Sequence, residues 1–73
     1  MHSSVTLTLN GERRVFEGQA AGFSVSALLA ALGLETKKVA VERNEEIVPR
    51  SRYAETWLAT GDSLEIVHFI GGG

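Results

Sequence analysis

Hydrophobic and polar residues alternate with a period of two near both ends of this chain. Val5, Leu7 and Leu9 alternate with threonines, so these three side chains are expected to face a core. Residues 63–70 alternate in the same way and form the predicted last strand. The pattern therefore predicts a chain that begins and ends in a β-sheet.

The dipeptide Asn10-Gly11 after the first strand predicts a tight hairpin, because both residues tolerate the positive φ angles of a type I′ turn. The register of the second strand is open. A strict two-residue turn sets Arg14 beside Leu7, whereas one extra loop residue with a bulge brings Val15 opposite Leu7. We favour the bulged register, since it keeps Arg14 off the core.

Residues 25–32 change to the period of an α-helix. Their large apolar residues fall at i, i+3, i+4 and i+7, which places them on one helix face. Ser24 is the expected N-cap, because its hydroxyl can accept a hydrogen bond from a free backbone N–H. Gly33 suits the left-handed position that ends a helix. The sequence therefore predicts one amphipathic helix of about three turns.

The second half of the chain predicts shorter elements. Residues 39–41 begin a third strand, and a turn at 44–46 leads into a short strand at 47–49 that ends in proline. Residues 51–58 predict a single helical turn attached to the body, with Trp57 as a lid over the core.

This order of elements predicts an α+β fold of the β-grasp type. We expect a mixed sheet of four to five strands, with the last strand beside the first and one main helix packed on one face. The other sheet face stays open. Residues 1–73 form one domain in this interpretation, with residues 70–73 as a flexible C-terminal glycine tail.

Composition narrows the possible functions. The chain has no cysteine, which removes a thiol nucleophile, a disulfide and a cysteine-based zinc site. Its net charge of -2 with only seven lysines and arginines disfavours nucleic acid as a partner. No apolar run approaches the ~20 residues that cross a bilayer. We therefore expect a soluble, cytoplasmic protein without a membrane partner.

The run Ile70-Gly71-Gly72-Gly73 is the candidate for chemistry. Glycines lose about 0.5–1 kcal/mol more than alanine on ordering, so we expect that the run is not packed. At ~3.5 Å per residue, four extended residues can carry a terminal carboxylate roughly 14 Å from the domain. The thin backbone leaves the carboxyl group of Gly73 open to attack in another protein's active site. The plain alternative is a frayed terminus.

The side chains predict no catalytic residue of the chain's own. His68 shares its strand face with Ile66 and is expected at the edge of the core, and His2 belongs to a mobile terminus. Neither histidine is placed with a serine or an aspartate in the way that a catalytic group requires. The sequence contains no phosphate-binding loop of the Walker type, and we expect no metal site.

Glu65, Val67 and Phe69 take the opposite face of the last strand, next to the tail. Two apolar side chains on the open sheet face predict a surface for docking a partner. The alternative is that they pack on a neighbouring loop. Arg50 and Arg52 could pair with an acidic partner, although isolated surface arginines are usually only solvated.

Several segments together resemble the ThiS family, the sulfur carriers of thiamine biosynthesis, which have a ubiquitin-like β-grasp fold. They are residues 39–44, 47–50, Gly61-Asp62 and the Gly72-Gly73 end, and the likeness covers nearly the whole chain. Gly71 stands where the family commonly has another small residue.

The resemblance implies a function without a permanently bound cofactor. An adenylating partner enzyme (ThiF-like) would use ATP to activate the carboxylate of Gly73, which a sulfur donor such as a cysteine desulfurase would convert to a thiocarboxylate. A thiazole synthase (ThiG-like) would then take the sulfur. The protein would be a carrier and not an enzyme.

Two other interpretations stay open. The small subunit of molybdopterin synthase shares the fold and tail, but it usually has prolines before the tail, and residues 67–70 contain none. A ubiquitin-like protein modifier or a β-grasp protein-binding module forms another class, in which the tail is an attachment point or incidental.

Overall fold

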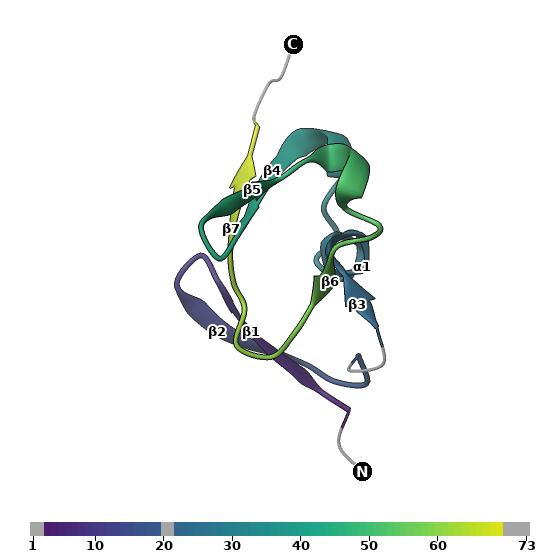
Figure 1. The fold of residues 1–73 in the computed structure, drawn as a ribbon, viewed down its shortest axis with the longest axis vertical. Helices are drawn as coiled ribbons and strands as arrows, with labels where there is room; N and C mark the ends of the chain where they lie inside the picture. The colour runs from purple at the N-terminus through teal and green to yellow at the C-terminus, as the bar shows by residue number, and fades with distance from the viewer. Residues whose placement is uncertain (1–2, 20–21, 70–73) are drawn as a thin grey trace.

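A computed structural model describes residues 3–19 and 22–69 of the chain and shows a mixed sheet with a helix on one face (Figure 1). The five strands lie in the order β2-β1-β7-β4-β5, and a second, two-stranded sheet pairs β3 with β6. The main sheet contains β1 (Val5–Leu9), β2 (Glu12–Phe16), β4 (Val39–Arg43), β5 (Glu46–Val48) and β7 (Ser63–His68). The remaining elements are β3 (Phe23–Ser24), α1 (Val25–Ala31), β6 (Trp57–Leu58) and two 3-10 turns, Thr36–Lys38 and Arg50–Arg52. The predicted α+β arrangement is confirmed.

The last strand, β7, is the centre of the main sheet. It runs parallel to β1 and antiparallel to β4, as the prediction of a last strand beside the first requires. The side chain of Asn10 continues the pairing beyond the end of β1. Its Nδ2 donates to the carbonyl oxygen of Ile66 at 3.2 Å, and its Oδ1 accepts from the Ile66 N–H at 2.7 Å. Both edges of β7 are therefore hydrogen-bonded as far as Ile66.

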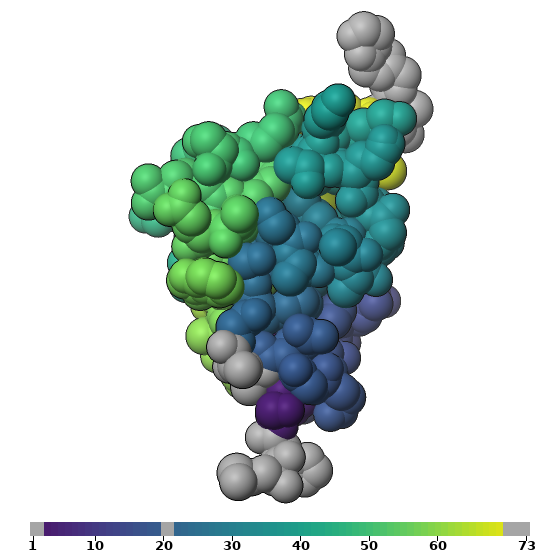
Figure 2. Space-filling model, turned by 90° about the vertical axis from the view of Figure 1, so that its right-hand side faces the viewer, coloured from purple at the N-terminus to yellow at the C-terminus, as the bar shows by residue number. Residues whose placement is uncertain are grey.

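The core lies between the main sheet and α1. Figure 2 shows that α1 and the segment around residues 50–60 cover this side of the sheet. The predicted inward residues of the first strand are buried, and so are Leu28 and Leu29 of the helix. The core consists of Val5, Leu7, Leu9, Phe23, Val25, Leu28, Leu29, Val39, Val41, Val48, Tyr53, Leu58 and Leu64. One thin core thus holds the domain together.

Both predicted helix caps are present. The Ser24 Oγ accepts a hydrogen bond from the Ala27 N–H at 3.0 Å. At the other end Gly33 has a φ of 72°, and the Leu34 N–H donates to the Leu29 carbonyl at 2.9 Å. This pattern is a Schellman motif, which satisfies carbonyl groups that the helix leaves free. The helix lies where the sequence predicts it but ends one residue earlier, and its seven residues make about two turns instead of the expected three.

The favoured register of the first hairpin is wrong. Asn10-Gly11 forms the predicted turn with φ angles of 49° and 84°, but it is the strict two-residue form, which pairs Arg14 with Leu7. Because β2 is an edge strand, Arg14 is exposed, and its guanidinium carbon lies 5.8 Å from the centroid of the Phe16 ring. The positively charged side chain of Arg14 can therefore lie on the helix side of the sheet, at its edge, without entering the core.

Residues 51–58 differ from the prediction in two ways. A 3-10 turn is present at Arg50–Arg52, but the segment continues into β6, which the sequence analysis missed. Trp57 is 59% exposed, so the prediction that it covers the core is wrong. Neighbouring strand residues point to opposite sides, and here Leu58 is the buried one. Tyr53 and Leu58 are the side chains of this segment that are buried in the core.

Among the residues that the structure describes, no helix is both long and apolar enough to cross a membrane.

Candidate functional site

The predicted reactive segment, Ile70 to Gly73, lies outside the described residues. The structure does describe the strand that leads to it. The Phe69 N–H donates to the Lys38 carbonyl oxygen at 2.7 Å, which extends the pairing of β7 with β4 one residue beyond His68. The backbone is therefore held in the sheet up to Phe69, directly before the glycine-rich end.

The three predicted docking residues lie on the surface. Val67 is 56% exposed and Phe69 is 46% exposed, and Glu65 is exposed as well. The alternation along β7 explains this arrangement, because Leu64 and Ile66 take the opposite side and pack toward α1. The prediction that these side chains point away from the core is confirmed. Their role in docking stays a prediction.

Residues of β4, which pairs with β7, and of β5, which pairs with β4, lie on the same face. Ala40 of β4 is directly opposite Val67, Glu42 is opposite Glu65, and Ile47 of β5 is opposite Glu42 and 76% exposed. We define the open-face patch as Ala40, Glu42, Ile47, Glu65, Val67 and Phe69.

The sequence analysis missed three members of this patch. For two of them the alternation along the strand was a sufficient signal. Because Val39 and Val41 face inward, Ala40 and Glu42 must lie on the open face. Ile47 follows in the same way from the burial of its neighbour Val48, which only the structure shows.

His68 is exposed on the helix side and lines a hollow of about 290 Å³ at the end of the sheet. The other lining residues are Leu9, Asn10, Glu12, Arg14, Leu32, Leu34 and Ile66. The sequence predicts that His68 shares its strand face with Ile66, and the structure confirms this side of the sheet.

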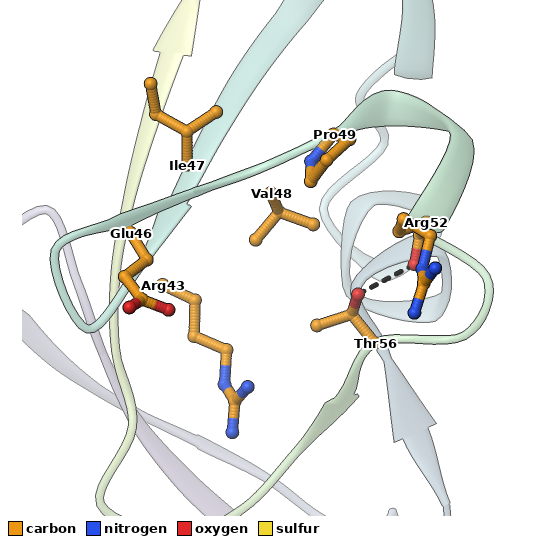
Figure 3. Close-up of a pocket in the computed structure, with 7 residues that line it drawn as sticks. All are labelled: Arg43, Glu46, Ile47, Val48, Pro49, Arg52 and Thr56. Carbon is orange, nitrogen blue, oxygen red and sulfur yellow. Dashed lines mark hydrogen bonds between the residues drawn. The ribbon is translucent and has the colours of Figure 1, made fainter.

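A second pocket of about 300 Å³ lies between the β4–β5 hairpin and the segment at residues 50–56 (Figure 3). It is lined by Arg43, Glu46, Ile47, Val48, Pro49, Arg52 and Thr56.

Arg50, which could pair with an acidic partner, lies outside this pocket lining. Its side chain donates to the Lys37 carbonyl at 3.4 Å. Within residues 3–19 and 22–69, no three His, Asp or Glu side chains gather to hold a metal ion.

Asp62 joins the turn before β7 to the end of β4. Its carboxylate accepts hydrogen bonds from the Arg43 Nε at 3.0 Å, the Asn44 Nδ2 at 3.1 Å and the Ala59 N–H at 2.9 Å. Burial alone would raise the pKa of Asp62, but these bonds and the charge of Arg43 outweigh it and lower the pKa. The carboxylate is therefore ionised and fixed, and its neighbours give it a structural role.

The comparisons with known proteins agree with this architecture. The model of the ThiS family matches residues 7–73, which is most of the chain and includes the glycine-rich end. The chain belongs to the ThiS family. A crystal structure of the thiamine biosynthesis protein ThiS from Geobacter metallireducens superposes with a TM-score of 0.80 at 36% identity, covering 94% of this chain and 100% of that one. The ubiquitin-like β-grasp prediction is thereby confirmed.

Two kinds of curated relatives resemble this ThiS-family chain. The sulfur carrier protein ThiS of Bacillus subtilis is 52% identical over 50 residues, which is 68% of this chain and 76% of that protein. A thiazole synthase of Paramagnetospirillum magneticum is 57% identical over 67 residues, 92% of this chain but 20% of that protein. A second thiazole synthase, from Magnetococcus marinus, is 48% identical over 65 residues and is covered to 19%. The chain thus spans about a fifth of the length of these thiazole synthases.

Proposed function

We propose that this protein is a sulfur carrier in thiamine biosynthesis, and that it carries sulfur on the α-carboxyl group of Gly73. One observation carries the proposal: the ThiS family match extends through residue 73, so it includes the Gly72-Gly73 pair. A relative of 52% identity bears the name sulfur carrier protein ThiS.

The chemistry acts on the main chain. A carboxylate does not react with a sulfur nucleophile until one oxygen becomes part of a good leaving group. In the first step a Gly73 carboxylate oxygen attacks the α-phosphorus of ATP, and pyrophosphate leaves. In the second step a sulfur nucleophile attacks the acyl carbon, and AMP leaves as the C–S bond replaces the C–O bond. When the nucleophile is a persulfide of the donor, the product is an acyl disulfide; a second thiol then attacks the donor's sulfur, forms a disulfide with the donor and releases the thiocarboxylate.

The carrier contributes the thin terminus and the surface beside it. Gly71, Gly72 and Gly73 carry no side chain that would shield the reacting carbonyl carbon. Ile70 joins them to Phe69, which directly follows β7, and the exposed side chains of Glu65, Val67 and Phe69 dock the partner. ATP is bound by the partner, and the carrier needs no cofactor of its own.

Three partners follow from this reaction sequence. A ThiF-like enzyme adenylates the carrier in the cytoplasm, where a cysteine desulfurase serves as the sulfur donor. A ThiG-like thiazole synthase accepts the sulfur. The resemblance of this chain to part of two thiazole synthases supports the last partner. Membership of the ThiS family favours this function over molybdopterin synthesis, protein modification or a general binding module.

The adenylation step can be tested by carrier-dependent exchange of labelled pyrophosphate into ATP, catalysed by a ThiF-like enzyme. The chain ending at Gly73 should support exchange. A variant without Gly73 and a variant with one alanine added after it should not, although both should keep the thermal stability of the parent. Equal exchange by all three proteins would contradict the proposal, because it would show that the Gly73 carboxylate is not the reacting group.

A further inference from the structure

The strand β2 lies at one edge of the main sheet (Figure 1), and the hydrogen bonds of β1 show which of its backbone groups are paired. The Thr8 N–H donates to the Asp62 carbonyl oxygen at 3.0 Å, directly before β7. The Asn10 N–H donates to the Leu64 carbonyl oxygen of β7 at 2.8 Å. Alternate residues of a strand turn their backbone groups to opposite sides, so residues 5, 7 and 9 of β1 bond to β2.

Two residues of β2 consequently turn their backbone groups outward. The partners of residues 5, 7 and 9 are residues 16, 14 and 12. Arg13 and Val15 lie between these hydrogen-bonded pairs, and their N–H and C=O groups point away from β1. In the described part of the chain, residues 3–19 and 22–69, β2 pairs with no strand other than β1. Its outer side is therefore an open sheet edge.

The side chains along this edge are exposed and include two positive charges. Arg13 and Val15 lie on the open face of the sheet, and Arg14 lies on the helix side. Among the residues that the structure describes, neither arginine takes part in an ion pair. The edge thus combines outward N–H and C=O groups with two adjacent guanidinium groups.

The other edge of the sheet is less suited to further pairing. β5 has three residues, and the residue after it, Pro49, has no N–H group to donate. β2 has five residues and contains no proline. A strand from another molecule therefore fits better beside β2.

We propose that β2 binds an extended segment of a partner protein as an additional antiparallel strand, with acidic side chains of that segment opposite Arg13 and Arg14. The outward groups of Arg13 and Val15 match the alternating N–H and C=O groups of such a strand, as in other cases of β-strand addition. Side chains of opposite charge at directly opposite positions stabilise a strand pair. An apolar side chain of the segment lies opposite Val15, which is 48% exposed.

A second copy of this chain fits the edge less well. Two antiparallel copies of β2 can pair Arg13 with Arg13, Arg13 with Val15, or Val15 with Val15, because these residues have the outward backbone groups. The first register sets the Arg13 side chains opposite each other, and the second does the same with Arg14, which is unfavourable. The third gives Arg13 a partner only at Glu17, beyond the end of β2. Charge therefore favours an acidic segment of another protein.

The proposed segment lies outside the open-face patch. β1 separates β2 from β7, and the patch residues come from β4, β5 and the end of β7 with Phe69. A segment bound at β2 does not cover the patch. It can therefore hold the carrier while another protein contacts the patch.

The test uses a synthetic peptide, Ser-Val-Ile-Glu-Glu-Thr-Ser, in an NMR titration of the isotope-labelled full chain. In the antiparallel register its two glutamates lie opposite Arg14 and Arg13, and its isoleucine lies opposite Val15. The amide signals of residues 12–16 should shift most. An Arg13→Gln/Arg14→Gln variant should bind about fivefold more weakly, because two charge pairs are lost. The same peptide with lysines in place of the glutamates should bind at least as weakly to the parent chain.

A Lys37→Gln/Lys38→Gln variant is the matched control for charge. It removes two exposed positive charges outside β2, so it measures the effect of the overall charge. Its affinity for the peptide should stay within about twofold of the parent value.

A second pair of variants tests the backbone contact. Val15→Pro removes the outward N–H but none of the hydrogen bonds to β1, and it should abolish binding of the peptide. Val15→Thr keeps the N–H and should bind within about twofold of the parent. The amide signals of β1 and the Tm show whether each variant is folded, and the arginine variant tests the proposal even if the proline variant is not.

Four results would overturn the inference. They are no binding of the peptide at millimolar concentration, equal affinities for the acidic and the lysine peptides, and shifts that concentrate outside β2. The fourth is a set of β2 signals that shift with carrier concentration in the absence of peptide, which would make a second copy the occupant.

Discussion

At the scale of single residues, Asp62 shows how one buried carboxylate fixes two loops. Three donors from two parts of the chain converge on it, Arg43 and Asn44 from one and Ala59 from the other, and its side chain is only 12% exposed. Asn44 strengthens the junction, because its Oδ1 also accepts from the Ser63 N–H at 2.9 Å. The start of β7 is thus connected to the end of β4 by side-chain bonds in addition to the strand ladder.

Replacement of Asp62 by alanine should lower the free energy of unfolding by about 1–3 kcal/mol, because Arg43 and the Ala59 N–H lose their acceptor. The lowered pKa also gives a pH dependence. The folded-state pKa lies below the unfolded value, so the stabilisation is complete above the ordinary carboxyl pKa of about 4 and is lost as the pH falls through the lowered pKa. Chemical denaturation at several pH values between neutral and acidic measures both effects.

The exposed Glu45→Gln variant serves as the control for this experiment, because Glu45 lies in the adjacent turn outside the Asp62 cluster. An Asp62→Ala protein whose stability falls with acid as steeply as that of the parent would contradict the account.

At the scale of elements, the ends of α1 determine how the helix meets the sheet. Ser24 begins the helix, and Gly33 reverses the chain so that Leu34 packs back on the core. A Cβ atom at Gly33 would meet no other atom within 4 Å. The requirement for glycine there comes from the backbone angle alone.

Gly33→Ala should therefore cost about 1 kcal/mol of folding free energy through its positive φ. Gly33→Asn should cost less, because asparagine tolerates the left-handed conformation better. Thermal unfolding of the three proteins measures the order. Equal losses for alanine and asparagine would indicate a steric cause and would contradict the conformational explanation.

Element prediction from the sequence worked where one local signal dominated. The caps of α1, the Asn10-Gly11 turn and the alternation of β7 each follow from neighbouring residues. The predictions were wrong where the position of a strand in its sheet decides which way a side chain faces. Arg14 can face the helix side because β2 is an edge strand, which no local pattern reveals. Trp57 points outward because β6 pairs with β3, a contact between distant segments.

At the scale of the whole molecule, β7 connects the fold to the proposed function. The strand lies between β1 and β4 in the middle of the sheet, and Figure 1 shows that its last described residues lie at the end of the molecule opposite the start of β1. The glycine-rich end was recognisable from the sequence, since its chemistry lies in the main chain. The composition of the open-face patch needed the strand register, because its members come from three strands.

Val67→Ser/Phe69→Ser should raise the KM of the adenylating enzyme for the carrier about tenfold or more, because two exposed apolar contacts of the patch are lost. The Tm should change little, since both side chains are about half exposed in the isolated chain. Val15→Ser is the matched control: Val15 is 48% exposed and lies on the same sheet face, but on the edge strand β2. If the double variant and the control have the same KM, the docking face lies elsewhere and the prediction is contradicted.

The most direct test of the carrier function is the intact mass of the chain ending at Gly73 after co-expression with the adenylating and sulfur-transfer enzymes. We predict a mass increase that matches one oxygen replaced by sulfur, located on Gly73 by fragmentation and absent from a variant without Gly73. An unchanged mass, under conditions in which the same enzymes convert another carrier to its thiocarboxylate, would contradict the account.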